Sequence, residues 1–397
     1  MRFDPEIYDK DAERELRWFF RWTNEQIWRN KIEKLESSPH FSDADLYQQY
    51  LRQKNPLMVT VDHYFNLTRD GKSIAKNLND FDKRVCGYIK LLNCISRGAS
   101  PSVLNRLKGS ILDDESVKAF LFELDLAIHF FRIGYDVRFT DLEGIGQYDL
   151  LVSNGEIELE VECKRKTIDA GRKIKKGDFC LLADILFAEL KESARRFAVL
   201  VTSNGRMGAD QALFKSLART VQDHLNSEPS VARVGNLEVR IKPLPEGLQI
   251  KSDAETFATL TQFKSLFSYY AVFSSRETTI IIRCESAESN KVLAAIYDEL
   301  KKGASQLSGT RPALLGCLIE EVEDKDWKDL QGGSGLQAVA ARLLENSTRR
   351  HINLLAFSSD RTPVKREENV VSFAATHFDF WHRNSKFALL KSFLFGS

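Results

Sequence analysis

Apolar and polar side chains alternate along two short segments between Gln147 and Lys166, joined by the turn sequence Ser153-Asn154-Gly155. Alternation with a period of two predicts two strands, and the turn between them predicts a β-hairpin. One face of the second strand is apolar and carries Ile157, Leu159, Val161 and Cys163. The other face is charged and carries Glu156, Glu158, Glu160, Glu162 and Lys164. Asp149, on the first strand, is expected on the same polar side of the hairpin.

A helical period precedes the hairpin, from about Asp114 to Arg132. Its apolar positions recur at a spacing of three and four residues, at Val117, Phe120, Leu121, Leu124, Ala127 and Phe131. We expect Asp113 or Asp114 to cap this helix and Gly134 to end it. Glu123 lies beside the apolar stripe, where a carboxylate is costly unless it has a partner. It is interpreted either as a residue at the edge of the stripe that reaches solvent or as a functional carboxylate.

The remaining patterns set the fold class. Residues 1–108 are predicted to be a helical region, and the hairpin is followed by a predicted helix at 179–196 and a strand at 197–202. Further strands are predicted at 278–284, 313–320, 352–357 and 370–373, with helices at 288–307 and 336–346. These elements predict an α/β (α+β) protein with a mixed central sheet flanked by helices. The predicted ranges are 1–108, 109–245 and 246–397, and the last either forms a separate domain or completes the same sheet.

The first helical segment is rich in aromatic residues, namely Trp18, Phe19, Phe20, Trp22 and Trp28. The favoured interpretation is a helix buried against its neighbours. The alternative is a set of aromatic rings that stack on bases beside a basic groove. Arg14, Arg17 and Arg21 on one helical face favour the alternative, but the glutamates among them weaken it.

Composition narrows the class of protein. A chain of 397 residues with 43% hydrophobic and 28% charged residues is typical of a globular protein with two or three domains. The net charge of +1 excludes a globally basic polynucleotide binder but not a local basic patch. The six cysteines form no CxxC pair and lack zinc-site spacing, so reduced thiols and a cytoplasmic protein are expected. No apolar run reaches about 18 residues, so neither secretion nor membrane insertion is expected.

Carboxylates and a lysine on one side of a hairpin are suited to hold a divalent metal ion and a water molecule. Glu162 is preferred to Glu160 as the ligand because only Glu162 stands two residues before a lysine on the same face. The competing interpretation is a solvated, charged face of an edge strand. A basic loop follows, and it is typical either of a solvated surface or, beside a metal site, of a surface for a phosphate backbone. Its candidate nucleic-acid contacts are Arg165, Lys166, Arg172, Lys173, Lys175 and Lys176.

The order of Glu123 on a helix, Asp149 on a strand and Glu162-Cys163-Lys164 on the next strand resembles the PD-(D/E)XK nuclease superfamily, which has a restriction-endonuclease-like fold. The resemblance covers about residues 114–203 and includes the helix and strand after the hairpin, with Tyr148 where the motif has proline. It implies that Asp149 and Glu162 ligate Mg2+ (or Mn2+), with the backbone carbonyl of Cys163 as a further ligand. It also implies that Glu123 holds the metal site directly or through water, and that Lys164 positions or helps deprotonate the attacking water.

The sequence therefore predicts a metal-dependent nuclease that hydrolyses phosphodiester bonds, with DNA favoured as the substrate. An alternative from another class is a catalytically inactive nucleic-acid-binding or assembly protein of the same fold. A third hypothesis is that the N-terminal and C-terminal regions sense a partner or a substrate and gate the nuclease. A homo-oligomer or a protein partner bound through these regions is also left open.

Overall fold

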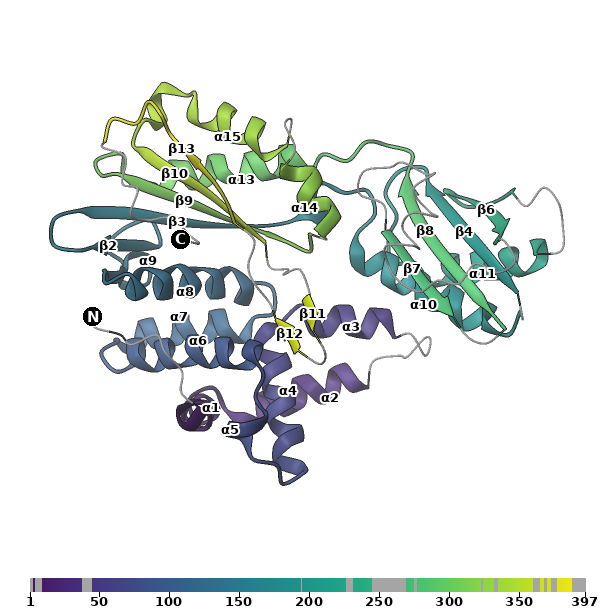
Figure 1. Ribbon diagram of the computed structural model, residues 1–397, viewed down its shortest axis with the longest axis horizontal. Coiled ribbons are helices and arrows are strands. Elements are labelled where there is room, and N and C mark those ends of the chain that lie inside the picture. Colours follow the sequence, from purple (N-terminus) through teal and green to yellow (C-terminus); the bar gives the residue numbers. More distant parts are fainter. Residues whose placement is uncertain are drawn as a thin grey trace. The chain divides into compact units, whose positions relative to one another are not determined.

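The computed structural model describes residues 3, 9–37, 45–193, 195–225, 231–244, 269–274, 277–322, 324–331, 335–359, 365–367, 370–372 and 377–387. Two compact units make up the chain (Figure 1). Unit 1 comprises Met1–Ser37, Arg52–Ile168 and Leu293–Ser397, and unit 2 comprises Ser38–Leu51 and Asp169–Val292. Unit 2 is thus largely an insertion, and the units divide the chain differently from the three predicted ranges. The predicted boundary between residues 245 and 246 lies outside the described residues.

A six-stranded mixed sheet forms the centre of unit 1. In spatial order its strands are β1 (Asp136–Phe139), β2 (Leu150–Ser153), β3 (Glu158–Thr167), β9 (Ala313–Glu320), β10 (Ile352–Ser359) and β13 (His377–Trp381). β1, β2 and β3 are antiparallel, β3, β9 and β10 are parallel, and β13 is antiparallel to β10. The predicted hairpin and mixed sheet are confirmed. β9 and β10 complete the sheet of the hairpin, which was one of the two alternatives for the C-terminal range.

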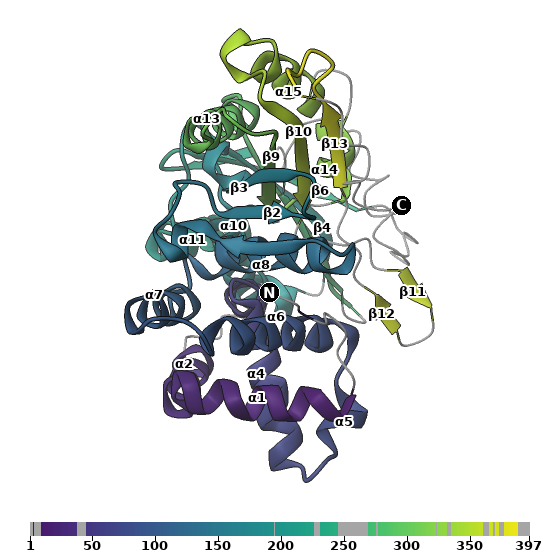
Figure 2. The same cartoon turned by 90° about the vertical axis from the view of Figure 1, so that its left-hand side faces the viewer.

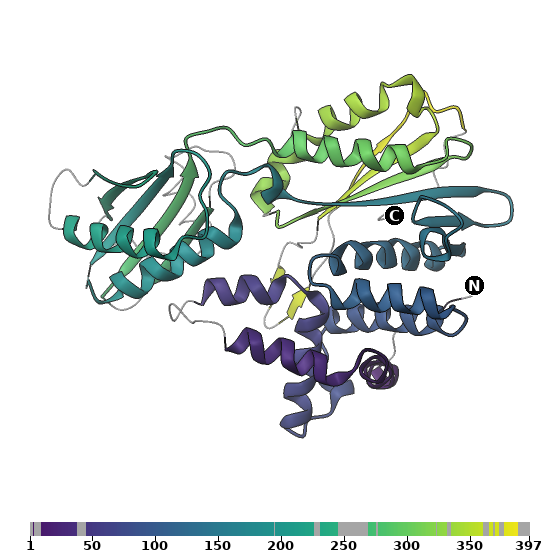
Figure 3. The same ribbon diagram turned by 180° about the vertical axis from the view of Figure 1, so that it is seen from behind.

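Helices cover both faces of this sheet. α8 (Val117–Arg132) lies on one face, and α13 (Val292–Gln306) and α15 (Leu336–Leu344) lie on the other, as Figures 1 and 3 both show. α8 buries its predicted apolar stripe in one core with β1, β2 and β3. Gly134 ends this helix with a left-handed φ of 88°, as predicted. Ser116 occupies the N-cap position without a side-chain capping hydrogen bond, and its hydroxyl donates to the carbonyl of Ser110 at 3.4 Å. Asp113 accepts from the backbone N–H groups of Glu115 and Ser116.

The N-terminal region is helical, as predicted. Its helices are α1 (Asp9–Thr23), α2 (Glu25–Glu36), α4 (Pro56–Arg69), α5 (Ile74–Asn77), α6 (Asp80–Ser96) and α7 (Pro101–Leu112). Figure 2 shows α1 and α6 stacked on the side of α8 that faces away from the sheet. Phe19 and Trp28 are fully buried in the same core as α8, which confirms the packing interpretation for them. Trp18 and Trp22 are half-buried and stack with ring centroids 5.2 Å apart.

Shorter elements complete unit 1. They are α9 (Thr140–Glu143), α14 (Asp324–Gln331), β11 (Lys365–Glu367) and β12 (Val370–Ser372). β11 and β12 pair with each other in a separate two-stranded ladder, so the strand predicted at 370–373 does not join the main sheet. No helix within the described ranges is long and apolar enough to cross a membrane. All six cysteines are free thiols, as predicted.

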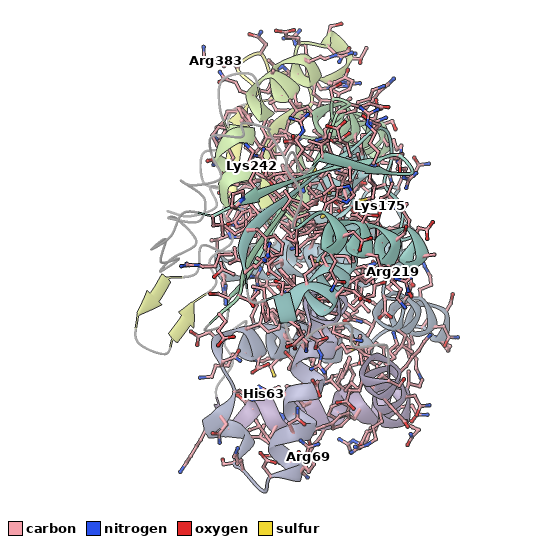
Figure 4. The ribbon with its side chains drawn as sticks, turned by 90° about the vertical axis from the view of Figure 1, so that its right-hand side faces the viewer. His63, Arg69, Lys175, Arg219, Lys242 and Arg383 are labelled. Carbon is pink, nitrogen blue, oxygen red and sulfur yellow. The ribbon has the colours of Figure 1, made fainter. Side chains whose placement is uncertain are left out.

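Unit 2 is built on its own five-stranded sheet. The strand order is β5 (Val231–Val234), β6 (Leu237–Pro243), β4 (Arg196–Ser203), β8 (Thr279–Ser286) and β7 (Tyr269–Ser274). α10 (Lys176–Leu190) and α11 (Gln211–His224) pack their apolar residues against this sheet. The buried carboxylate of Asp184, on α10, accepts the first backbone N–H groups of α3 (Leu46–Gln53) at 3.0 and 2.8 Å. Figure 4 shows Lys175, Arg219 and Lys242 among the exposed side chains of this unit.

One expectation about the core is wrong. The helix predicted at 179–196 and the strand predicted at 197–202 form as α10 and β4, but they do not extend the sheet of the hairpin. β4 pairs with β6 and β8 instead, whereas β3 pairs in parallel with β9. The helix and strand that complete the hairpin's sheet are therefore α13 and β9, which follow the insertion in sequence.

Candidate active site

The hairpin brings Asp149 next to Glu162, which lies in the middle of β3. Asp149 immediately precedes β2, and its Oδ2 accepts the backbone N–H of Cys163 at 2.6 Å. The antiparallel register pairs Leu150 with Val161, so its continuation by one residue places Asp149 opposite Glu162. Cys163 turns its side chain toward the α8 core, and the residues on either side of it therefore face the side of α13.

Glu162 is the most constrained carboxylate of the site. It is 0% exposed, and neither of its oxygens accepts a hydrogen bond from any residue that the structure describes. Its Oε1 does contact Lys164 Nζ as an ion pair. A buried carboxylate usually has several hydrogen-bond donors, because burial without them costs free energy. The surroundings of Glu162 therefore leave coordination capacity for a cation.

Burial is the largest cause that raises the pKa of each of the three carboxylates. Burial raises the pKa of Asp149 to about 6, although the backbone N–H of Cys163 counteracts it. Burial and then the charge of Asp149 raise the pKa of Glu162 to about 8. Burial, Asp149 and Glu162, in that order, raise the pKa of Glu123 well above its usual value. The charges of Asp149 and Glu162 thus act on Glu123, although Glu123 is carried by α8, on the opposite face of the sheet from α13.

Lys164 is a cation in this arrangement. Burial is the largest single influence and would lower the pKa of its ammonium group, but the interactions with Glu162 and Asp149 together outweigh burial and raise that pKa above its usual value. The side chain is 16% exposed. A lysine held in its charged form suits it to orient a water molecule or a phosphate oxygen, and makes it a weaker candidate for a general base.

The hydrogen-bond partners of Glu160 and Glu162 differ, and they bear on which of the two glutamates is the candidate metal ligand. Glu160 is also fully buried, but it accepts from the backbone N–H of Ser308 at 2.8 Å, from the Ser308 hydroxyl, and from Arg311 Nη1 at 3.4 Å. Glu158 accepts from Arg311 Nε at 2.7 Å. Glu160 is therefore already satisfied by the protein, whereas Glu162 is not.

The predicted nucleic-acid contacts do not form one open basic patch. Arg165 and Lys166 lie on β3 in unit 1, where Arg165 pairs with Glu320 and Lys166 pairs with Glu299 at 3.1 Å. The other four lie in unit 2. Arg172 and Lys176 are buried, Lys173 pairs with Glu288, and Lys175 is exposed before α10.

The reason for this difference lies in partners distant in sequence. The ring of Tyr269 lies against the Arg172 guanidinium, 4.7 Å from centroid to Cζ, and the hydroxyl of Tyr269 bonds to Asp169 at 2.5 Å. The backbone N–H of Lys176 donates to Asp169 Oδ2 at 2.6 Å. Two residues of the basic run, Arg172 and Lys176, are thus buried within unit 2 and not exposed on its surface.

Sequence reasoning missed the contribution of α13. Gly303 of this helix lies against the side chain of Lys164, and Gln306 Nε2 donates to the backbone carbonyl of Gln147 at 3.1 Å. The only local signal was a glycine inside a helical pattern, which is costly and often has a packing reason. Because unit 2 separates β3 from α13 in sequence, the contact of α13 with Lys164 could not be predicted from neighbouring residues.

The donor chemistry of the site fits a hard divalent cation. Asp149, Glu162 and Glu123 supply carboxylate oxygens, the ligands that Mg2+ prefers, and the two oxygens of Glu162 accept no hydrogen bond from the residues that the structure describes. In the described part of the chain, no group of three His, Cys, Asp or Glu side chains is already arranged to hold a metal ion.

Comparisons of the chain with protein-family models, with curated proteins and with solved structures give no match. The fold itself is a mixed α/β architecture, whose described residues form a six-stranded sheet, a five-stranded sheet and a two-stranded ladder. Any more specific assignment therefore rests on the site and its topology.

Proposed function

We propose that unit 1 is a metal-dependent nuclease with a restriction-endonuclease-like core, which hydrolyses phosphodiester bonds of DNA. The order of elements supports this proposal. α8, β1, the β2–β3 hairpin, α13 and β9 follow one another as helix, strand, hairpin, helix and strand, with β9 parallel to β3. This is the order that the PD-(D/E)XK resemblance implies, with unit 2 as an insertion between β3 and α13.

The observation that carries the proposal is the environment of Glu162. A fully buried carboxylate that lies opposite Asp149 and whose close contact among the described residues is the ion pair with Lys164 is costly for a protein that uses it only structurally. Such strain is characteristic of sites arranged for a ligand or for chemistry. A divalent cation is the ligand that this set of oxygens fits best.

In the proposed mechanism, Asp149 and Glu162 would hold the metal ion, with the carbonyl of Cys163 and the carboxylate of Glu123 completing its surroundings. The chemistry that such an ion supplies when bound is neutralisation of charge on the phosphate and a lower pKa for water. The N–H of Cys163 fixes the orientation of Asp149. Lys164, held as a cation by Glu162, orients the attacking water against the scissile phosphate.

The test is cleavage of plasmid, linear duplex DNA and RNA by the purified full-length chain, with Mg2+ or Mn2+ and with EDTA. We expect DNA cleavage that requires the metal and is lost in Asp149→Asn prepared in the same way, which controls for contaminating nucleases. Lys301→Met, an exposed residue of α13, is the matched control and should cleave like the wild type. Cleavage that persists in EDTA or in Asp149→Asn would contradict the proposal. Nucleic-acid binding without cleavage would favour the inactive binding protein.

A further inference from the structure

One face of α13 is directed at the candidate active site. Glu299, Gly303 and Gln306 follow one another at spacings of four and three residues and so share one side of the helix. Each of them meets a residue of the hairpin or of the loop that leads into it. These residues lie far from the catalytic motif in sequence, and the proposed roles of the four site residues do not include them.

Gly303 is the point of closest approach. A Cβ at this position would lie 2.8 Å from Leu315 Cδ1, 2.9 Å from Lys164 Cγ and 3.1 Å from Lys164 Cε. Real side chains essentially never approach so closely, so any larger residue has to displace the stem of Lys164. The absence of a side chain at residue 303 therefore lets the helix backbone pack directly against the stem of Lys164, next to Glu162.

Gln306 and Glu299 contact the hairpin and its preceding loop on either side of Gly303 along α13. Gln306 donates to the backbone carbonyl of Gln147, two residues before Asp149, and so anchors the loop that delivers this carboxylate. Glu299 binds Lys166, the next residue after Lys164 on the same face of β3, at 3.1 Å. Glu299 also binds Lys302 of its own helix at 3.3 Å.

We infer that α13 is the positioning helix of this site: Gly303 holds the Lys164 side chain against Glu162, and Gln306 fixes the loop that carries Asp149. Neither residue touches a reacting group, and both act through their neighbours. The catalytic meaning of the inference rests on the proposed function, but the positioning itself concerns the protein without metal or substrate. It can therefore be tested separately.

The first test measures the accessibility of Lys164 in the metal-free protein. Gly303→Val is compared with Gly109→Val, because Gly109 lies on α7 with nothing within 4 Å of an added Cβ. Amine acetylation is followed for each lysine by mass spectrometry, with the buried Lys118 of α8 as an internal measure of global opening. We expect acetylation of Lys164 to rise about fivefold or more in Gly303→Val alone, because labelling of a shielded amine is limited by how often its surroundings open. Unchanged labelling of Lys164, or an equal rise at Lys118, would overturn the inference.

The second test removes the Gln306 donor without changing the side-chain volume much. In Gln306→Met we expect faster amide hydrogen exchange in the segment 145–149 and, where DNA is cleaved, a lower kcat with an unchanged KM. A purely structural role would instead lower the melting temperature without changing exchange in this segment selectively, and that result would overturn the inference. If the wild type cleaves nothing, acetylation and exchange still decide the inference, while the proposed function alone fails.

Discussion

Glu162→Gln is expected to reduce metal-dependent DNA cleavage by at least about a hundredfold, whereas Glu160→Gln should stay within a few-fold of the wild type. The two residues lie on the same face of β3, are both fully buried and differ in their partners. Glu160 is satisfied by Ser308 and Arg311, and Glu162 has oxygens free of hydrogen bonds from the described residues. The substitutions are isosteric, so a difference in activity reports the lost charge and not a cavity.

Stability should change in the opposite sense for the same pair. Glu160→Gln weakens charge-assisted hydrogen bonds to Ser308 and Arg311 and is expected to lower the free energy of unfolding by about 2 kcal/mol. Initial cleavage rates and urea unfolding of both variants measure the two effects. A large loss of cleavage in Glu160→Gln with full activity in Glu162→Gln would move the catalytic carboxylate to Glu160 and contradict the assignment.

The second large effect concerns the stability of the metal-free protein. The pKa of Glu162 is raised to about 8 in the fold, mainly by burial, and that of Asp149 to about 6. In the unfolded chain both groups ionise near their ordinary values of about 4. At pH values between the unfolded and the folded pKa, the carboxyl groups of Glu162 and Asp149 keep their protons in the folded protein and have lost them in the unfolded chain. Its stability in EDTA should therefore fall as the pH rises from about 5 to about 8.

Glu162→Gln removes most of the free-energy cost of keeping a buried carboxylate ionised at neutral pH. We expect it to stabilise the metal-free protein at pH 7 by about 2 kcal/mol, which is below the full value for such a pKa shift because Lys164 loses its partner. The dependence of unfolding free energy on pH should also become flatter. Urea unfolding in EDTA at several pH values, with Glu158→Gln as an exposed control, measures both effects. A wild-type protein that gains stability from pH 5 to pH 8 would contradict the electrostatic account.

Local patterns were sufficient to predict the hairpin and the helix of Glu123, whereas the set of four site residues stays a prediction. The alternation along β3 determines which side chains share a face, and the stripe on α8 determines which side of that helix is buried. The partner of β3 was not predictable in this way. β4, the next strand in sequence, is apolar like β9. Only the structure shows that β3 pairs with β9, across the insertion, and not with β4.

Contacts between side chains that are distant in sequence could not be predicted either. Nothing near Arg172 indicates Tyr269 as its partner, and nothing near Glu160 indicates Ser308. A count of charges therefore overestimated the open basic surface and left the register of the glutamates undecided. The contact of Gly303 with Lys164 was hidden for the same reason.

The central claim is that Asp149 and Glu162 hold a divalent cation, and the most direct measurement is anomalous diffraction from crystals of the full-length protein soaked in Mn2+. The account predicts an anomalous peak between these two carboxylates, with Glu123 nearby, and no such peak in Glu162→Gln crystals soaked in the same way. Well-diffracting, Mn2+-soaked wild-type crystals without a peak at this position would contradict the claim.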